Sequence, residues 1–218
     1  MNAIAEFFSK IICINLDKRT DRWESFQKEF GCHVSMKKHV TRFSAIPHSR
    51  PFIGFNLSQL GCLKLCSNET GPVLILEDDA TLLPGAEEIF AEAIQQLPVN
   101  WEVLYLGAMI FSGNFQGEKI SRNLVTAKRL VCTHAMAYNV GVPARIYKEY
   151  NMPSLYLNKP NIYDCWLSRS IVKRGKAYLI NPMISWQDGS YSDLSNQVSV
   201  GPNMFELTQK KLPAIHDS

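Results

Sequence analysis

The sequence has no apolar run long enough to cross a bilayer. Its first apolar stretch, residues 7–16, is interrupted by Lys10 and is far shorter than the ~20 residues that a spanning helix needs. The first ten residues include Glu6 and lack the basic segment that opens a secretory signal. We therefore expect a soluble, cytoplasmic protein without a transmembrane segment.

Closely paired cysteines and repeats are also missing. The six cysteines, at positions 13, 32, 62, 66, 132 and 165, form no C-x-x-C pair, which argues against a zinc site, and a disulfide framework is not expected in a chain of 218 residues. Hydrophobic residues make up 46% and charged residues 20%, so global disorder is excluded. At ~150 residues per domain, the length fits one large domain or two small ones.

Charges of one sign are absent from long stretches. Residues 65–118 contain nine acidic side chains and no Lys, Arg or His. Residues 119–148 contain six Lys or Arg and no acid, and residues 31–50 are likewise basic. Most of these charges are expected to pair across the fold. The alternative is that some basic residues face an anionic ligand, such as a diphosphate, an acidic glycan or a nucleic acid.

Short apolar runs alternate with segments of helical periodicity. Strands are expected at residues 11–14, 40–46, 73–76, 101–106, 124–138 and 177–180, and helices at 20–30, 56–70, 84–97, 143–150 and 164–175. Asn56 and Gln59 have the spacing of a capping box, so one helix is expected to begin at Asn56. The alternation predicts an α/β sandwich with a central, mainly parallel sheet. Residues 182–193 are interpreted as a polar loop.

An apolar strand that runs into three carboxylates, Glu77, Asp78 and Asp79, is the most informative feature. Strand alternation predicts that Glu77 and Asp79 point to one side and Asp78 to the other. No cation is close in sequence, so mutual repulsion should raise at least one pKa. A hard dication, Mg²⁺ or Mn²⁺, removes that conflict, and ligands of open α/β sheets bind beyond the carboxyl ends of the strands. The alternative is an acidic surface turn that caps the next helix.

Seven motifs, in order over residues 10–195, resemble glycosyltransferase family 25, which includes lipooligosaccharide and procollagen galactosyltransferases. The matching segments are residues 12–22, Gly61-Cys62, residues 73–80, Leu106-Gly107, residues 134–138, Asp164, and residues 182–193 with Gln187 and Ser192-Asp193. The chain departs from the family pattern at Leu65-Cys66, near the place where the family commonly has Ser-His.

The resemblance implies a GT-A-type fold that binds a nucleotide sugar, formed by residues 1–200 as a single domain, with residues 201–218 as a loosely held C-terminal tail. Carried over, Glu77 and Asp79 would hold Mn²⁺ or Mg²⁺, with His134 as a further candidate ligand. The nucleotide would be bound by Asn15, Leu16, Arg19, Arg22, Asp78 and Gln187. Gln187 and Trp186 could contact the sugar or a phosphate. The alternatives are a helix-surface ion pair for Arg22, a structural role for His134 and a core position for Trp186.

Family members invert the anomeric centre, which requires a carboxylate that takes the proton of the acceptor hydroxyl. Asp164 is our choice for this base, and a plain helix N-cap is its alternative. Asp188 and Asp193 are second choices.

These features predict a metal-dependent inverting glycosyltransferase. It would move a hexose from UDP-galactose or UDP-glucose to a hydroxyl of a surface glycan, a protein or a modified nucleobase. The alternatives are a degenerate member that binds nucleotide or glycan without turnover, a metal-dependent phosphohydrolase, and a nucleic-acid-binding module. The sequence does not indicate the oligomeric state.

Overall fold

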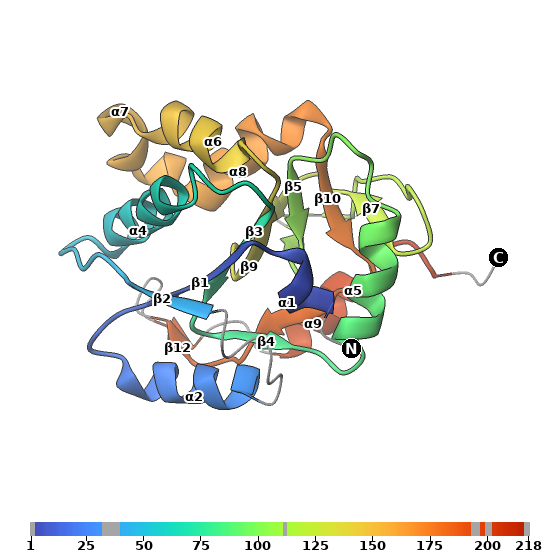
Figure 1. The fold of residues 1–218 in the computed structure, drawn as a ribbon, viewed down its shortest axis with the longest axis horizontal. Helices are drawn as coiled ribbons and strands as arrows, with labels where there is room; N and C mark the ends of the chain where they lie inside the picture. The colour runs from blue at the N-terminus through green and yellow to red at the C-terminus, as the bar shows by residue number, and fades with distance from the viewer. Residues whose placement is uncertain (1–2, 32–39, 111–112, 193–196, 199–201, 216–218) are drawn as a thin grey trace.

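A seven-stranded sheet lies at the centre of the part of the chain that the computed structural model describes, residues 3–31, 40–110, 113–192, 197–198 and 202–215 (Figure 1). Its strand order is β2-β1-β3-β9-β5-β10-β7. Its strands are β1 (Lys10–Asn15), β2 (Val40–Ser44), β3 (Val73–Glu77), β5 (Val103–Tyr105), β7 (Leu124–Thr126), β9 (Ala135–Tyr138) and β10 (Ala177–Ile180). Only β9 and β7 run against the others, so the mainly parallel sheet is confirmed.

Three short strand pairs lie outside this sheet among the described residues. β4 (Ala80–Leu82) pairs with β11 (Ser185–Gln187), β6 (Met109–Ile110) with β8 (Leu130–Val131), and β12 (Tyr191–Ser192) with β13 (Gln197–Val198). The β4–β11 pair matters for function because it joins the segment after β3 to a segment more than a hundred residues away.

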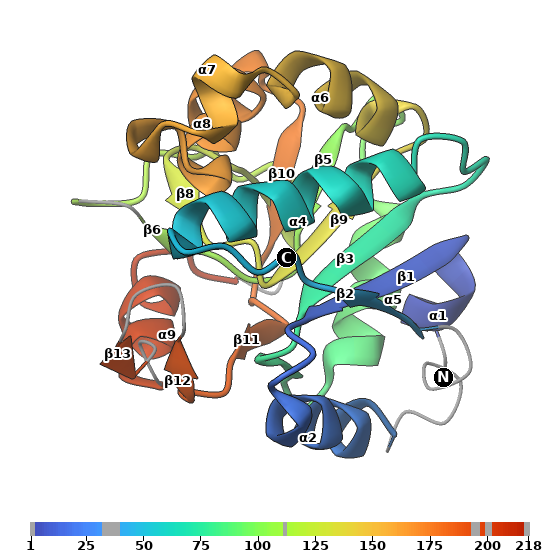
Figure 2. The same ribbon diagram turned by 90° about the vertical axis from the view of Figure 1, so that its left-hand side faces the viewer.

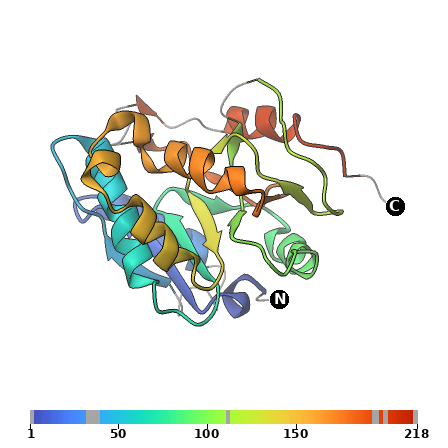
Figure 3. The ribbon, with the colours of Figure 1, turned by 90° about the horizontal axis from the view of Figure 1, so that it is seen from above.

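Helices cover both faces of the sheet, as Figures 2 and 3 show. The described helices are α1 (Ala3–Phe7), α2 (Thr20–Gly31), α4 (Pro51–Leu65), α5 (Ala86–Gln95), α6 (Val142–Tyr150), α7 (Pro153–Tyr156), α8 (Tyr163–Ser170) and α9 (Pro202–Gln209), with short 3₁₀ turns η1 (Lys159–Asn161) and η2 (Val172–Arg174). Helices α4, α6 and α8 share one apolar core, and α1, α2 and α5 share the other. No helix in the described segments is both long and apolar enough to cross a membrane.

Strand β3 shows why these residues form a central strand. Val73 and Ile75 belong to the core beneath α4 and α8, whereas Leu74 and Leu76 belong to the core beneath α1, α2 and α5. All four side chains are almost completely buried. A strand that is buried on both faces requires a continuous apolar run, which is the pattern read in the sequence.

Two local expectations are wrong. The helix expected from Asn56 begins at Pro51, and Asn56 lies inside α4, where its side chain binds the carbonyl of Tyr156 and the N–H of Tyr163. A proline at the first turn starts the helix as effectively as a capping side chain. Residues 185–187, expected in a polar loop, form β11.

The expected loose tail also contains structure. Residues 202–209 form α9, which packs beside β6 and β11. The ring of Phe205 lies 5.5 Å from that of Trp186, and Leu212 is buried. These apolar contacts hold the segment against the domain.

Candidate functional site

A cavity of about 380 Å³ opens beyond the carboxyl ends of β1, β2 and β3. Parallel strands end at the same edge of a sheet, so the polar residues that follow each of them meet there. Its lining combines three carboxylates with basic, amide and apolar groups: Ile14, Leu16, Lys18, Arg22, Ala45, Ile46, Pro47, His48, Pro51, Gly54, Phe55, Ser58, Gln59, Glu77, Asp78, Asp79 and Gln187. Leu16, Arg22, Glu77, Asp78, Asp79 and Gln187 were predicted site residues, and the structure brings them together.

The three carboxylates do not alternate as the extended chain would require. β3 ends at Glu77, and Asp78 and Asp79 lie in a turn. Arg22, in the first turn of α2, donates to Asp78 at 2.6 Å and to Asp79 at 3.1 Å. The predicted separation of Asp78 from Asp79 is therefore wrong, because the turn places both acids against one guanidinium group.

Asn15 positions this ion pair rather than lining the cavity. Its Nδ2 group donates to Asp78 at 2.6 Å, and its Oδ1 atom accepts from the Arg42 guanidinium. Asn15 is the last residue of β1 and is buried, so these bonds fix the Asp78 carboxylate at the edge of the sheet. Ser190 adds a second anchor, since its hydroxyl accepts from Arg22 at 2.6 Å.

Glu77 is held by a different partner from those of Asp78 and Asp79. The Thr133 hydroxyl donates to its Oε1 atom at 2.6 Å. Thr133 lies in the segment between β8 and β9, directly before the antiparallel neighbour of β3. The pairing of β3 with β9 therefore supplies this contact.

Gln187 reaches the cluster through the β4–β11 pair, in which it stands opposite Ala80. Its Nε2 group donates to Asp79 Oδ2 at 3.2 Å, and the backbone N–H of Asp188 donates to the Asp79 carbonyl at 2.8 Å. The second-choice base Asp188 is thus beside the cluster. Asp193 lies outside the described residues.

Burial perturbs all three carboxyl groups. Burial, and then the Asp79 carboxylate, raises the pKa of Glu77 to about 8, although the Thr133 hydrogen bond lowers it. Burial raises the pKa of Asp79 to about 6 against the opposing effect of Arg22, and burial also raises the pKa of Asp78. The pKa values are raised, as expected, but burial is the larger cause and repulsion between the carboxylates the smaller one.

The carboxylates of the cluster offer a dication a free oxygen but not a complete set of protein ligands. Asp79 Oδ1 is buried and has no hydrogen-bond partner among the described residues, so one carboxylate oxygen is available beside Glu77. Nowhere in the described ranges do three His, Cys, Asp or Glu side chains gather as a ligand set. Mg²⁺ commonly binds through one or two carboxylates and completes its shell with substrate phosphates and water. Glu77 and Asp79 fit that mode.

Asp164 lies in the first turn of α8, and Ile162 is the N-cap of that helix, so Asp164 is not the capping residue. The Asp164 carboxylate accepts from the backbone N–H of Cys165 at 2.6 Å. Burial raises the pKa of Asp164, while backbone N–H groups of Cys165 and Cys132 lower it. The Asp164 charge also raises the pKa of Glu77, which places both carboxyls in one electrostatic neighbourhood.

Arg19 and His134, like Asn15 and Asp164, do not line the cavity. Arg19 binds the exposed Asp21 carboxylate and the carbonyl of Tyr191. His134 is completely buried, and burial lowers its pKa to about 4. Its ring lies 5.6 Å from that of Trp186, which is itself a core residue. The backbone N–H of Glu77 donates to the His134 carbonyl at 2.9 Å, but among the described residues no hydrogen bond joins the His134 ring to Glu77 or Asp79.

Gln59 is a cavity residue that the sequence reading assigned only to a helix cap. It is 1% exposed, and neither its Nε2 nor its Oε1 atom has a hydrogen-bond partner among the described groups. A buried amide without partners is costly to the fold, about 1–3 kcal/mol for each unsatisfied group. The only available sequence signal was an amide in an otherwise apolar stretch of helix. Lys18 and His48, at the same cavity, were also missed.

No protein-family model matches the chain, and no curated protein matches it. Among solved structures, the chain is similar to a glycosyltransferase involved in the glycosylation of the major capsid of PBCV-1, with a TM-score of 0.52 and 11% identity over 79% of this chain and 81% of that one. This similarity, together with the observed sheet, identifies the fold as GT-A-like.

Two further structures are more distant. A putative glucose-1-phosphate thymidylyltransferase from Bacillus anthracis gives a TM-score of 0.47 at 13% identity, covering 93% of this chain and 77% of that one. A nucleoside-diphosphate-sugar pyrophosphorylase from Vibrio cholerae gives 0.46 at 16% identity, covering 96% and 84%. Identities this low describe the fold alone.

Proposed function

We propose that this chain is a glycosyltransferase that moves a hexose from UDP-galactose or UDP-glucose to an acceptor hydroxyl, as the motifs shared with glycosyltransferase family 25 imply. One observation carries the proposal. The cavity beyond β1, β2 and β3 presents an acidic cluster and basic side chains in the same 380 Å³ space. A nucleoside diphosphate with a bound dication needs both kinds of group.

The nucleoside diphosphate is assigned to this cavity. Arg22 and Lys18 are its phosphate partners, and a guanidinium can hold phosphate through paired N–H donors. Leu16 and Phe55 provide apolar walls for the base. The Gln59 amide, buried and without partners, supplies one donor and one acceptor to the edge of the base.

Glu77 and Asp79 are the residues that would hold Mn²⁺ or Mg²⁺, which when bound would neutralise charge on the departing diphosphate. Asp164 is the general base. The acceptor oxygen forms a bond to the anomeric carbon while the bond from that carbon to the diphosphate oxygen breaks, and the hydroxyl proton passes to Asp164. A single displacement of this kind inverts the anomeric centre.

The direct test is incubation with UDP-galactose, UDP-glucose and GDP-mannose in the presence of Mn²⁺, with chromatography of the released nucleotide. Slow, Mn²⁺-dependent release of UDP from one donor supports the proposal. Inorganic phosphate released from p-nitrophenyl phosphate, without UDP release from any donor, would instead identify a phosphohydrolase.

Asp79→Ala provides the matching binding test. Calorimetric titration with UDP and Mn²⁺ should show that the metal-dependent affinity for UDP is lost. Circular dichroism should show that the fold is retained. Asp21→Ala is the control, because Asp21 is exposed and pairs with Arg19 outside the cavity. Undiminished UDP affinity in Asp79→Ala would remove Asp79 from the metal site.

A second candidate is binding without turnover, and the Arg22 ion pair favours it. Arg22 already pairs with both Asp78 and Asp79 and offsets part of their charge, so an anionic nucleotide could bind in the absence of a metal. UDP affinity that is equal in Mn²⁺ and in chelator, with no donor hydrolysis, would favour this candidate.

A further inference from the structure

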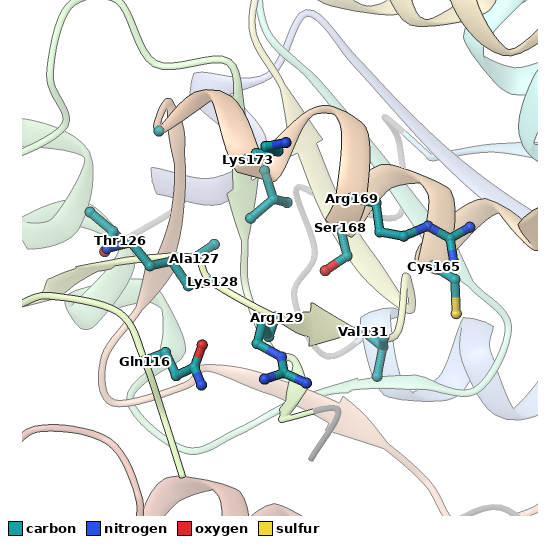
Figure 4. Close-up of a pocket in the computed structure, with 12 residues that line it drawn as sticks. Gln116, Thr126, Ala127, Lys128, Arg129, Val131, Cys165, Ser168, Arg169 and Lys173 are labelled. Carbon is teal, nitrogen blue, oxygen red and sulfur yellow. The ribbon is translucent and has the colours of Figure 1, made fainter. Parts of the chain in front are cut away.

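A second and larger cavity, of about 690 Å³, lies between the segment of residues 126–131, which joins β7 to β8, and the α8–η2 segment (Figure 4). Its apolar lining comes from both sides and includes Ala127, Val131 and Val172, which are buried. In Figure 4 the labelled residues of the segment 126–131 stand opposite the labelled side chains of α8. The volume falls within the range of about 300–1,000 Å³ that is typical of small-molecule sites.

Four basic side chains, Lys128, Arg129, Arg169 and Lys173, surround this apolar lining. No Asp or Glu is among the described residues that line it. Lys128 pairs with Glu118, but both of these side chains are well exposed, so solvent weakens the pair. The cavity therefore has a positive potential.

Arg169 adds to this potential because its hydrogen bonds in the described part of the chain go to neutral oxygens. Its guanidinium donates to the carbonyl of Pro160 and to the side chain of Asn161, which hold its position without cancelling its charge. Lys128 and Arg129 belong to the basic stretch 119–148, and both line this cavity.

The basic cavity is adjacent to the assigned base. Cys165 lines the cavity and directly follows Asp164. Val131 also lines it and directly precedes Cys132, whose backbone N–H bonds to the Asp164 carboxylate. Each wall of the cavity thus contains a residue next in sequence either to Asp164 or to Cys132, which bonds to Asp164.

We propose that this basic cavity binds the acceptor, and that the acceptor is an acidic saccharide carrying a carboxylate or a phosphate. The inference rests on the proposed function, because an acceptor hydroxyl must reach Asp164. The apolar lining suits the faces of a sugar ring, and the four cations suit its anionic substituent.

The test measures acceptor binding without any donor, so that it is independent of UDP recognition. Glucuronic acid, glucose 6-phosphate, glucose and inorganic phosphate are titrated separately into the full-length protein and followed by NMR shift perturbation. We expect at least one acidic sugar to bind ten-fold or more tightly than glucose and than phosphate alone. A uronate preference and a phosphate preference distinguish the two possible acidic groups.

Lys173→Glu should weaken binding of that acidic sugar at least ten-fold, since it reverses one of the four charges at the cavity, and the fold should be retained because Lys173 is exposed. Lys148→Glu makes the same charge change on the exposed surface of α6, away from the cavity, and should alter the affinity less than two-fold. UDP affinity should be unchanged in Lys173→Glu.

Equal affinity for glucose and the acidic sugars, or unchanged binding in Lys173→Glu, would overturn the inference. Tighter binding of a single-stranded DNA oligonucleotide than of every acidic sugar, abolished by Lys173→Glu, would assign the cavity to nucleic acid and also overturn it. If acidic sugars bind here but UDP binds nowhere, the cavity stands as an acidic-saccharide site and the transferase function fails.

Discussion

Replacing Glu77 by glutamine should make the protein more stable at pH 8 while impairing metal-dependent donor binding. Glutamine keeps an oxygen that accepts from the Thr133 hydroxyl, as Glu77 does at 2.6 Å. It removes the carboxyl proton and its titration. The variant therefore isolates the energetic effect of one buried acid in the candidate site.

The magnitude follows from the two pKa values of Glu77. The unfolded chain loses this proton near pH 4.5, whereas the folded chain holds it to about pH 8. Between these values the folded state binds more protons, so a rise in pH weakens the fold. At about 1.4 kcal/mol per pKa unit, the wild-type protein loses about 2–5 kcal/mol across this window, and the variant does not.

The assay is urea unfolding of both proteins at pH 5, 6, 7 and 8 in chelator. The difference between the two unfolding free energies should widen as the pH rises, in favour of Glu77→Gln. Saturating Mn²⁺ and UDP should restore stability to the wild type but not to the variant, because ligands stabilise only the state that binds them.

Glu118→Gln is the control for this series. Glu118 is exposed, and its hydrogen bond from Lys128 lowers its pKa, so it titrates below the window and should leave the pH dependence unchanged. If the unfolding free energies of wild type and Glu77→Gln change in parallel from pH 5 to pH 8, the view that ionisation of Glu77 destabilises the fold is refuted.

Three other substitutions test separate parts of the structure. Asp164→Asn should keep UDP affinity and lose sugar transfer, and wild-type turnover would exclude Asp164 as the base. Gln59→Leu should stabilise the ligand-free protein by about 1 kcal/mol, because it removes two buried polar atoms that have no partner among the described residues. In calorimetry it should weaken the binding of UDP but not of pyrophosphate. Unchanged UDP affinity would contradict a contact between Gln59 and the nucleotide base. Gly107→Ala should destabilise by about 3 kcal/mol in urea unfolding, because a Cβ there would overlap the Ser185 carbonyl oxygen. Wild-type stability of Gly107→Ala would show that the segments around Gly107 and Ser185 separate readily.

The sheet could be predicted from sequence because its strands carry their own signal. Val73 to Leu76 are buried on both faces, and only a continuous apolar run satisfies such a position. The carboxylates after that run also had a predictable location, since carboxyl ends of parallel strands are where ligands bind. Helix boundaries were less predictable, as Asn56 shows, because a polar residue inside a helix can bind distant backbone groups.

The partners within the site could not be predicted, because they come from distant parts of the chain. Arg22 is 56 residues from Asp78, and Gln187 is 108 residues from Asp79. These contacts depend on where α2 and β11 lie in the fold, and no local pattern carries that information. The same holds for Thr133, which reaches Glu77 through the antiparallel pairing of β3 with β9.

The charge balance of the cluster explains why one arginine is not enough. Arg22 pairs with Asp78 and Asp79, and Glu77 adds a third carboxyl to the same cavity, so three ionised carboxylates would exceed the Arg22 charge by two. The folded protein relieves part of this excess by keeping the Glu77 proton to about pH 8. A dication would remove the whole excess, and its binding at pH 7 must then displace that proton. Metal binding in the proposed transferase is therefore coupled to proton release from Glu77, and Glu77→Gln should bind Mn²⁺ and UDP more weakly and release fewer protons than wild type.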